Sequence, residues 1–112
     1  MKYMLLVYDN PANWTNVTED EMQGLYAGYA AVSQNPATVD SAQLKPVETA
    51  KTVRLNGGDT ITTDGPFAET KEHLGGYYLV DTGSIEDALA IAATIPSVKM
   101  GGSVEVRALV EM

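Results

Sequence analysis

Residues 64–78 read DGPFAETKEHLGGYY, and the rest of the predicted fold is arranged around this stretch. Gly65 can adopt a positive φ and Pro66 fixes the next φ, so the first residues predict a rigid turn. Four charged or titratable side chains follow, namely Glu69, Lys71, Glu72 and His73. Gly75 and Gly76 then open an aromatic strand. The stretch therefore places polar groups on a loop that leads directly into a sheet, an arrangement common in binding sites.

Length and composition limit the classes of protein to consider. The 112 residues are enough for one domain, which we expect to span residues 1–112, and the chain has no cysteine. Disulfides, thiolate metal sites and cysteine nucleophiles are therefore excluded. The sequence has no signal-peptide pattern and no long apolar segment, so we expect a cytoplasmic protein. It also lacks a phosphate loop, a nucleophile elbow and recognisable metal-ligand spacing, so we predict no cofactor and no metal.

The charge of the chain disfavours two kinds of partner. The net charge is -8 and the pI is about 4.3, and the few basic residues are scattered. Such a surface repels phosphate backbones and anionic lipids. We therefore expect no direct binding to nucleic acid or to membranes.

Hydrophobic periodicity predicts strands and helices in alternation. Residues 2–9 are apolar on both faces, which predicts a strand buried on two sides. Thr18 and Glu21 form a capping box that begins a helix at about 18–34. We interpret the aromatic stripe of this helix as core, with a cofactor-binding stripe as the alternative. Trp14, in the loop before it, covers the core or lines a ligand cleft.

The second half of the chain repeats this alternation after a loop. Residues 35–49 predict a loop with a short strand near 42–45. The turn at residues 56–59 predicts a β-hairpin with arms at 51–56 and 60–64. A strand at 75–81, a helix that begins after Ser84 and is stopped by Pro96, and a final strand from Val104 complete the pattern.

This order of elements predicts an α+β fold. We expect a ferredoxin-like antiparallel sheet with two helices on one face and an inserted β-hairpin. Right-handed crossovers place both helices on the same face and leave the other face uncovered.

Several segments share a family resemblance. Residues 64–81, DGPFAETKEHLGGYYLVD, closely resemble the signature of the DGPF proteins, a branch of the YCII-related superfamily of small α+β proteins. Residues 2–8 (KYMLLVY), 44–46, 50–54 and 101–107 resemble the same family. The resemblance implies a fold of the dimeric α/β-barrel type, and thus a homodimer formed through the sheet. An apolar sheet face left open by the helices supports the same expectation.

Two functional classes follow from the resemblance. The first is a small-molecule-binding or accessory protein, associated with transcription regulation of the sigma-factor type through contact with a regulator protein. The second is a small enzyme of isomerase, lyase or dehalogenase type that acts on a small polar organic molecule. The wider superfamily carries a His and Asp pair proposed as an active site. This chain has no histidine in residues 10–50, and Asp40 is only a weak match to the partner.

Five residues are the candidate site. We predict that residues 66–73, the signature loop, cover a polar pocket beside the end of the first strand. Asp64, Glu69 and His73 are the candidate catalytic groups, since a desolvated carboxylate or an imidazole can transfer protons. Asp64 can instead tie its own turn, and His73 can be a structural residue. Tyr8, Arg54, Asp64 and Glu69 are the candidate ligand contacts.

Overall fold

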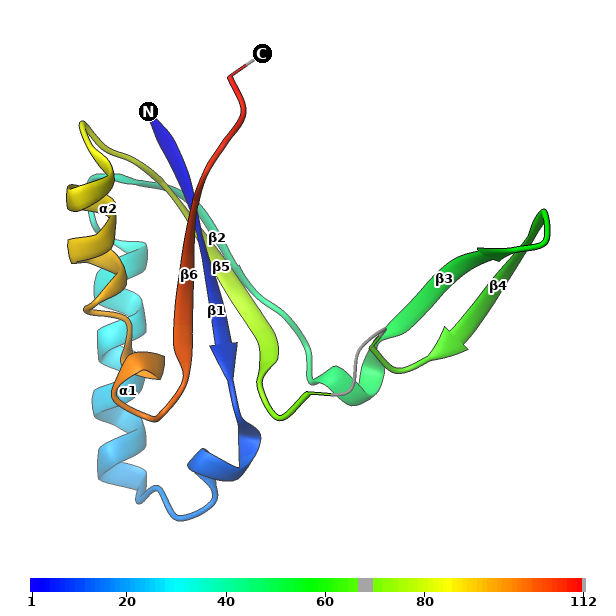
Figure 1. The fold of residues 1–112 in the computed structure, drawn as a ribbon. Coiled ribbons are helices and arrows are strands. Elements are labelled where there is room, and N and C mark those ends of the chain that lie inside the picture. Colours follow the sequence, from blue (N-terminus) through cyan, green and yellow to red (C-terminus); the bar gives the residue numbers. More distant parts are fainter. Residues whose placement is uncertain (67–69, 112) are drawn as a thin grey trace.

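The computed structural model describes residues 1–66 and 70–111. Four strands form an antiparallel sheet with the order β2-β5-β1-β6. Their bounds are Lys2–Asp9 for β1, Thr38–Gln43 for β2, His73–Asp81 for β5 and Ser103–Ala108 for β6. Helices α1 (Glu19–Ser33) and α2 (Ile85–Ala92) cover the same face of this sheet (Figure 1). The predicted α+β, ferredoxin-like fold with two helices on one face is confirmed.

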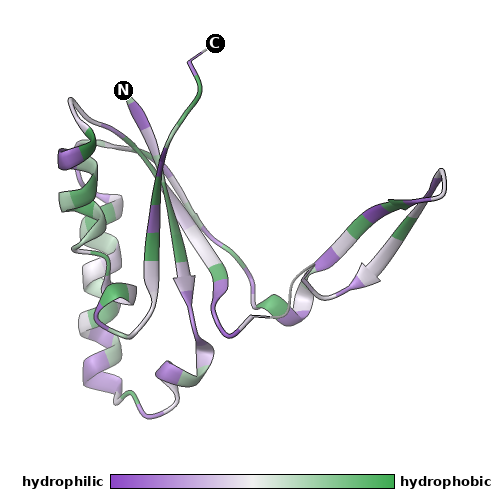
Figure 2. Cartoon of the chain, in the orientation of Figure 1, coloured by the Kyte–Doolittle hydropathy of each residue, from purple (hydrophilic) through white to green (hydrophobic). Residues whose placement is uncertain are grey.

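The inserted hairpin is also present, as a separate two-stranded sheet. Strand β3 (Lys51–Asn56) pairs with β4 (Asp59–Asp64), and the hairpin projects away from the body of the molecule (Figure 1). Gly57 and Gly58 form the turn with φ values of 59° and 92°, as a tight hairpin turn requires. Hydrophobic and hydrophilic residues alternate along β3, whereas β4 is mostly polar with one hydrophobic residue (Figure 2).

The hydrophobic core lies between the helices and the sheet. Alternation along β1 and β5 directs every second side chain towards the helices. The buried members are Tyr3, Leu5, Val7, Val32, Tyr78, Val80, Ala88, Ala92 and Ile95. The opposite face of β1 and β5 is only half-buried, at Met4, Leu6, Tyr77 and Leu79. We predicted that both faces of these strands are buried. In the single chain only the face that packs against the helices is buried.

Both helices begin at the predicted caps. The Thr18 hydroxyl accepts from the Glu21 backbone N–H at 3.2 Å and donates to the Glu21 carboxylate at 2.9 Å. Ser84 accepts from the backbone N–H of Asp87 at 3.2 Å. Helix α2 ends at Ala92, earlier than the predicted stop at Pro96, because the buried Ile95 already leads into a short 3-10 helix over Pro96–Val98.

Two further 3-10 turns are present, and β2 lies at one edge of the four-stranded sheet. The turns cover Pro11–Trp14 and Val47–Thr49. Strand β2 begins earlier than the short strand predicted near 42–45. As an edge strand with mostly exposed side chains it has no hydrophobic alternation to reveal it.

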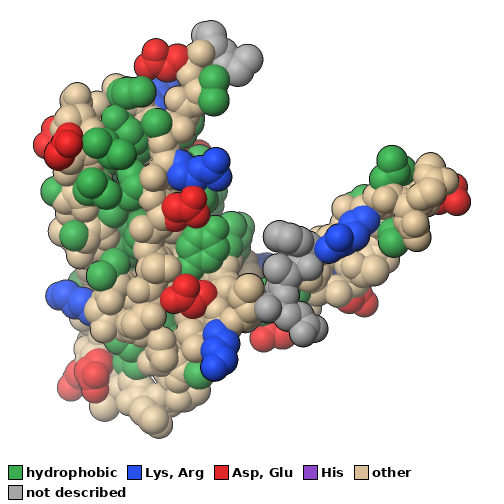
Figure 3. All heavy atoms as spheres, in the orientation of Figure 1, with side chains coloured by type: hydrophobic (Ala, Val, Ile, Leu, Met, Phe, Trp, Pro, Cys, Tyr) green, Lys and Arg blue, Asp and Glu red, His purple; other side chains and the backbone are tan. Residues whose placement is uncertain are grey.

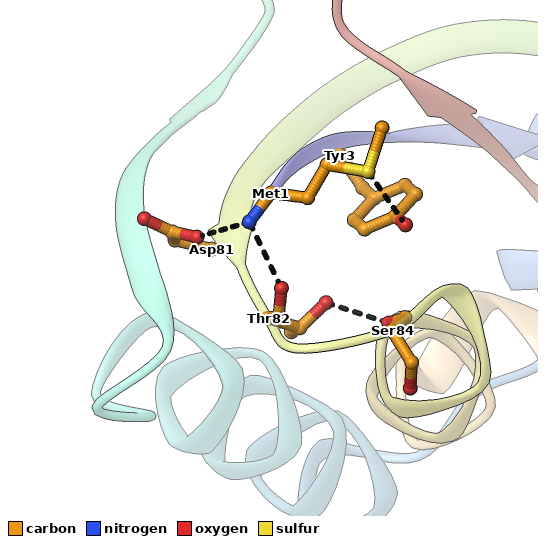
Figure 4. A network of polar contacts seen from close by, with 5 residues as sticks. All are labelled: Met1, Tyr3, Asp81, Thr82 and Ser84. Carbon is orange, nitrogen blue, oxygen red and sulfur yellow. Dashed lines mark hydrogen bonds and ion pairs between the residues drawn. The ribbon is translucent and has the colours of Figure 1, made fainter.

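The start of β1 is fixed by a small polar network (Figure 4). The α-amino group of Met1 donates to the Asp81 carboxylate at 3.0 Å and to the Thr82 carbonyl at 3.1 Å. The Thr82 hydroxyl donates to the Ser84 carbonyl at 2.8 Å. Tyr3 is buried, and its hydroxyl donates to the Met1 sulfur at 3.4 Å. The network ties the first strand to the turn that leads into α2.

Candidate functional site

A cavity of about 510 Å³ opens between α1 and the sheet. This volume lies within the range of small-molecule sites in proteins, about 300–1,000 Å³. Its wall comes from β1, the turn after β1, α1, β2 and β5. The principal lining residues are Val7, Asp9, Trp14, Met22, Tyr26, Tyr29, Ala30, Ser33, Ser41, Gln43, Gly75, Gly76 and Tyr78.

Asp9 is the charged residue of this wall. It is the last residue of β1, and its carboxylate lies between two glycine backbones. A Cβ built on Gly102 would come within 3.0 Å of Oδ1, and one built on Gly75 within 3.5 Å of Oδ2. Oδ1 is enclosed by protein and accepts no hydrogen bond from any residue in the described parts of the chain. A buried acceptor without a donor is costly, so a positively charged or hydrogen-bond-donating group in the cavity, beside Oδ2, would stabilise this carboxylate.

Tyr29 forms a second part of the wall and is held rigidly. Its hydroxyl lies 2.6 Å from the hydroxyl of Ser97, which is fully buried. Its ring stacks on the indole of Trp14 with a centroid distance of 6.4 Å and an interplanar angle of 24°. Burial raises the pKa of Tyr29 above its usual value and the negative charge of Asp9 raises it further, while the hydrogen bond with Ser97 opposes the shift. Tyr29 is therefore a neutral phenol at physiological pH.

Tyr78 extends the aromatic wall from the sheet side. Its hydroxyl donates to the Tyr29 carbonyl at 3.2 Å and so links β5 to α1. Burial raises the pKa of Tyr78, and a hydrogen bond with Ser33 acts in the opposite direction. Gly76 keeps the neighbouring strand close, because a Cβ there would lie 2.7 Å from the Ala42 carbonyl oxygen. These contacts hold the cavity-lining part of β5 against α1 and β2, and the cavity lies between α1 and the sheet.

The residues predicted from the sequence lie mostly elsewhere. Asp64 ends β4 on the hairpin, where its carboxylate accepts from Lys51 Nζ at 2.6 Å and its side chain is 86% exposed. Arg54 is exposed on β3 of the same hairpin. Glu69 lies outside the described residues. These positions are not among the described residues that line the cavity.

Tyr8 precedes Asp9 on β1 and His73 pairs with Asp9 across the sheet, but neither residue lines the cavity. Tyr8 is half-buried on β1, where alternation with Val7 directs it away from the helices. His73 begins β5 directly opposite Asp9 and is half-buried. The cavity also lies beside the end of the first strand, but none of the five predicted residues is among its described lining residues, and the predicted pocket under the signature loop stays a prediction.

The sequence contained one sign of the aromatic wall. We interpreted the stripe on α1 as core, and Tyr29 does pack against the core cluster. Met22 and Tyr26 line the cavity instead, and Tyr26 is 62% exposed. Trp14 lines the cavity and stacks on Tyr29, which fits the cleft alternative. The sequence signals available were therefore the aromatic residues of the stripe and Trp14 in the loop before it, and they did not distinguish cavity wall from core.

Comparison with known protein families agrees with the resemblance in the sequence. The sequence model of the YCII-related domain matches residues 1–112. The chain belongs to the YCII-related family. A relative in Rhizobium meliloti (strain 1021), described as an uncharacterized protein, is 35% identical over 114 residues. The alignment covers 97% of this chain and 92% of the relative. The comparisons therefore show the family of the chain but assign no reaction to it.

Within residues 1–66 and 70–111, no group of three or more His, Cys, Asp or Glu side chains is placed to hold a metal ion. No helix in the described part of the chain has the length and apolar character needed to cross a membrane.

Proposed function

We propose that this YCII-related protein binds a small organic molecule in the cavity between α1 and the sheet. The observation that carries the proposal is the Asp9 carboxylate, which lines the cavity with one enclosed oxygen that has no donor among the described residues. The protein acts, on this proposal, as a single-domain accessory or regulatory protein in the cytoplasm. A link to sigma-factor-type transcription regulation would run through contact with a regulator protein, since the net charge of -8 disfavours contact with DNA.

The build of the cavity supports binding of a small molecule. Ligand sites are typically apolar concavities with a few well-placed polar groups. Here the aromatic wall is fixed by hydrogen bonds of Tyr29 and Tyr78, whereas Asp9 supplies one polar anchor. Because these side chains are already held in place, less conformational entropy is lost when a ligand binds.

The proposal is tested by native mass spectrometry of the protein purified from its own cells. We expect a bound small molecule that is lost from the variant Ala30→Trp, because Ala30 lines the cavity and the indole would fill it. The matched control is Ala31→Trp, at an exposed position of α1 outside the described lining. A bound molecule that survives in Ala30→Trp as well as in Ala31→Trp would place the binding site elsewhere.

Catalysis in the same cavity is the second candidate function. The Asp9 carboxylate in the cavity wall favours it, since a carboxylate can act as a general base. An isomerase, lyase or dehalogenase type of reaction on a small polar molecule would use Asp9 as the base. Proton abstraction from carbon would appear as deuterium incorporation into the co-purified molecule in D2O. The Asp9→Asn variant should abolish it, and no incorporation with the original protein would exclude this type of step.

A contribution of the signature loop to the site remains a prediction. The site residues predicted from the sequence with this loop are Tyr8, Arg54, Asp64, Glu69 and His73. The variant Glu69→Gln should then weaken binding of the co-purified molecule without a change in melting temperature. An unaffected affinity would remove Glu69 from the site.

We also propose that the protein is a homodimer formed through the open face of the sheet. That face carries Met4, Leu6, Tyr77 and Leu79, and no helix in the described part of the chain covers it. The radius of gyration of the single chain is 16.0 Å, whereas a compact chain of this length has about 13 Å. The excess comes from the projecting hairpin, and a partner packed against both the sheet face and the hairpin would make the assembly compact.

The exposed hydrophobic residues of the hairpin also support a homodimer. Val53 and Leu55 share one face of it and are 63% and 74% exposed. Hydrophobic side chains reach the surface on both the body and the hairpin (Figure 3). A two-stranded hairpin is marginally stable alone in water, so a hairpin of this kind requires something to pack against. A second copy offers the apolar face that matches it.

Light scattering measures the oligomeric state directly. We expect twice the chain mass of 12.0 kDa at micromolar concentration. Leu55→Glu should shift the protein towards the monomer. The control Leu89→Glu changes an exposed leucine on α2 and should leave the dimer intact. A monomer mass for the original protein would contradict the proposal.

A further inference from the structure

The charge of the cavity is unbalanced. Asp9 is the one formally charged side chain among its described lining residues, which include no lysine, arginine or histidine. The chain as a whole carries a net charge of -8 and so adds to the negative potential around the cavity. An anionic ligand would therefore meet repulsion from Asp9 and from the surrounding protein.

The position of Asp9 makes this charge important for a ligand. Its Oδ1 is enclosed and accepts no hydrogen bond within the part of the chain that the structure describes. A carboxylate that is partly removed from water is unfavourable unless a cation or donor compensates it. Asp9 lines the cavity beside Gly75, next to its Oδ2, so a positive group on a bound ligand there would compensate the charge of the carboxylate.

The remaining walls fit a cation with a carbon skeleton. Trp14, Tyr26 and Tyr29 contribute aromatic rings to the cavity. The Tyr29 hydroxyl is engaged with Ser97, and the Tyr78 hydroxyl with the Tyr29 carbonyl. These two tyrosines therefore contribute ring surface more than free hydrogen-bond donors. Aromatic faces attract ammonium groups, most strongly when the cation is partly desolvated.

We infer that the cavity takes a small organic cation, an alkylammonium whose positive group lies at Asp9 and whose carbon atoms lie against Trp14, Tyr26 and Tyr29. This inference rests on the proposed small-molecule function of the cavity and adds the chemical class of the ligand. Three independent features point to it: the single uncompensated carboxylate, the aromatic wall, and a volume of about 510 Å³ that suits a molecule of this size.

Trp14 provides the reporter for the test. It is the single tryptophan of the chain and lines the cavity, so its fluorescence reports occupancy directly. The probes are choline and 3,3-dimethylbutan-1-ol, which share their shape but differ in charge. We expect choline to bind at least about tenfold more tightly than the neutral alcohol, as expected for a carboxylate and aromatic rings acting together.

Two variants separate the contributions to this preference. Asp9→Asn should reduce the choline preference several-fold and leave only the part that the aromatic rings contribute. Tyr26→Ala should weaken choline several-fold, and since Tyr26 is exposed, the fold should be retained. Asp20→Asn removes an exposed charge near the start of α1 and is the control, with the preference unchanged. Circular dichroism of each variant confirms folding, and Tyr26→Ala keeps the test informative if Asp9→Asn unfolds.

The outcomes distinguish this inference from the proposed function. Equal binding of choline and the neutral alcohol by the original protein would overturn the cation inference while leaving small-molecule binding in the cavity intact. No response to either probe at about 50 mM would also overturn it. The proposed function would fail separately, if no molecule co-purified or if Ala30→Trp retained one. A charge preference of undiminished size in Asp9→Asn would contradict the assignment of Asp9 as the anchor.

Discussion

Alanine at Gly28 tests how α1 is held against the rest of the molecule, and Gly24 supplies a control within the same helix. Replacing glycine by alanine inside a helix stabilises a protein by about 1 kcal/mol when space is free. At Gly24 a new Cβ would meet no heavy atom within 4 Å. At Gly28 it would come within 2.7 Å of Pro96 Cγ, whereas carbon atoms pack at about 3.5–4.0 Å.

The two effects oppose each other at Gly28, and their magnitudes decide the sign. Overpacking of this kind costs about 1–3 kcal/mol, which cancels or exceeds the helix gain of about 1 kcal/mol. Gly24→Ala should therefore raise the free energy of unfolding by about 1 kcal/mol, or the melting temperature by about 4 °C. Gly28→Ala should leave it unchanged or lower it by up to about 2 kcal/mol.

Equilibrium unfolding in urea measures both variants, with an unchanged slope as the check that each is two-state. An equal gain in stability at both positions would refute the reasoning, because it would show that α1 does not press against Pro96. That result would also weaken the account of the cavity. Pro96 directly precedes Ser97, whose hydroxyl fixes the ring of Tyr29 in the cavity wall.

Three further predictions concern a helix cap, alkaline stability and the hairpin. Thr18→Ala should lower the free energy of unfolding by about 1 kcal/mol in urea, since it removes the cap of α1. Burial raises the pKa of Tyr29 and Tyr78 above 10.0, so their contribution to stability is complete below about pH 10 and falls as the pH rises towards the folded pKa. Tyr78→Phe should therefore flatten the decline of melting temperature between about pH 9 and pH 11. Gly57→Ala and Gly58→Ala should each lower stability by about 1 kcal/mol, since both positions have positive φ, and leave affinity for the co-purified molecule unchanged.

Elements with a strong local signal could be predicted from the sequence. Thr18 and Ser84 mark the two helix starts by their own side-chain chemistry, and both caps are present. The turn glycines at 57–58 specify the hairpin in the same way. Strand β2 could not be located as well, because its exposed, mostly polar residues give no periodic pattern. Its position depends on pairing with β5, which is a tertiary effect.

The cavity was harder to predict because no single stretch of sequence contains it. Asp9, Trp14, Tyr29, Ser41 and Gly76 come from five parts of the chain that only the sheet order brings together. Local polarity directed the prediction to the signature loop instead. Asp64, taken there as a candidate proton carrier, forms an exposed ion pair across the hairpin.

The position of ligand-induced changes in the backbone NMR spectrum tests the central claim most directly. The protein would be labelled with nitrogen-15 and titrated with the molecule that co-purifies with it. We predict that the largest shifts fall on the amides of Asp9, Trp14, Gln43 and Gly76 and on the indole N–H of Trp14, all of which belong to the cavity wall. Shifts confined to the hairpin at residues 51–64, with these groups unmoved, would contradict a binding site between α1 and the sheet.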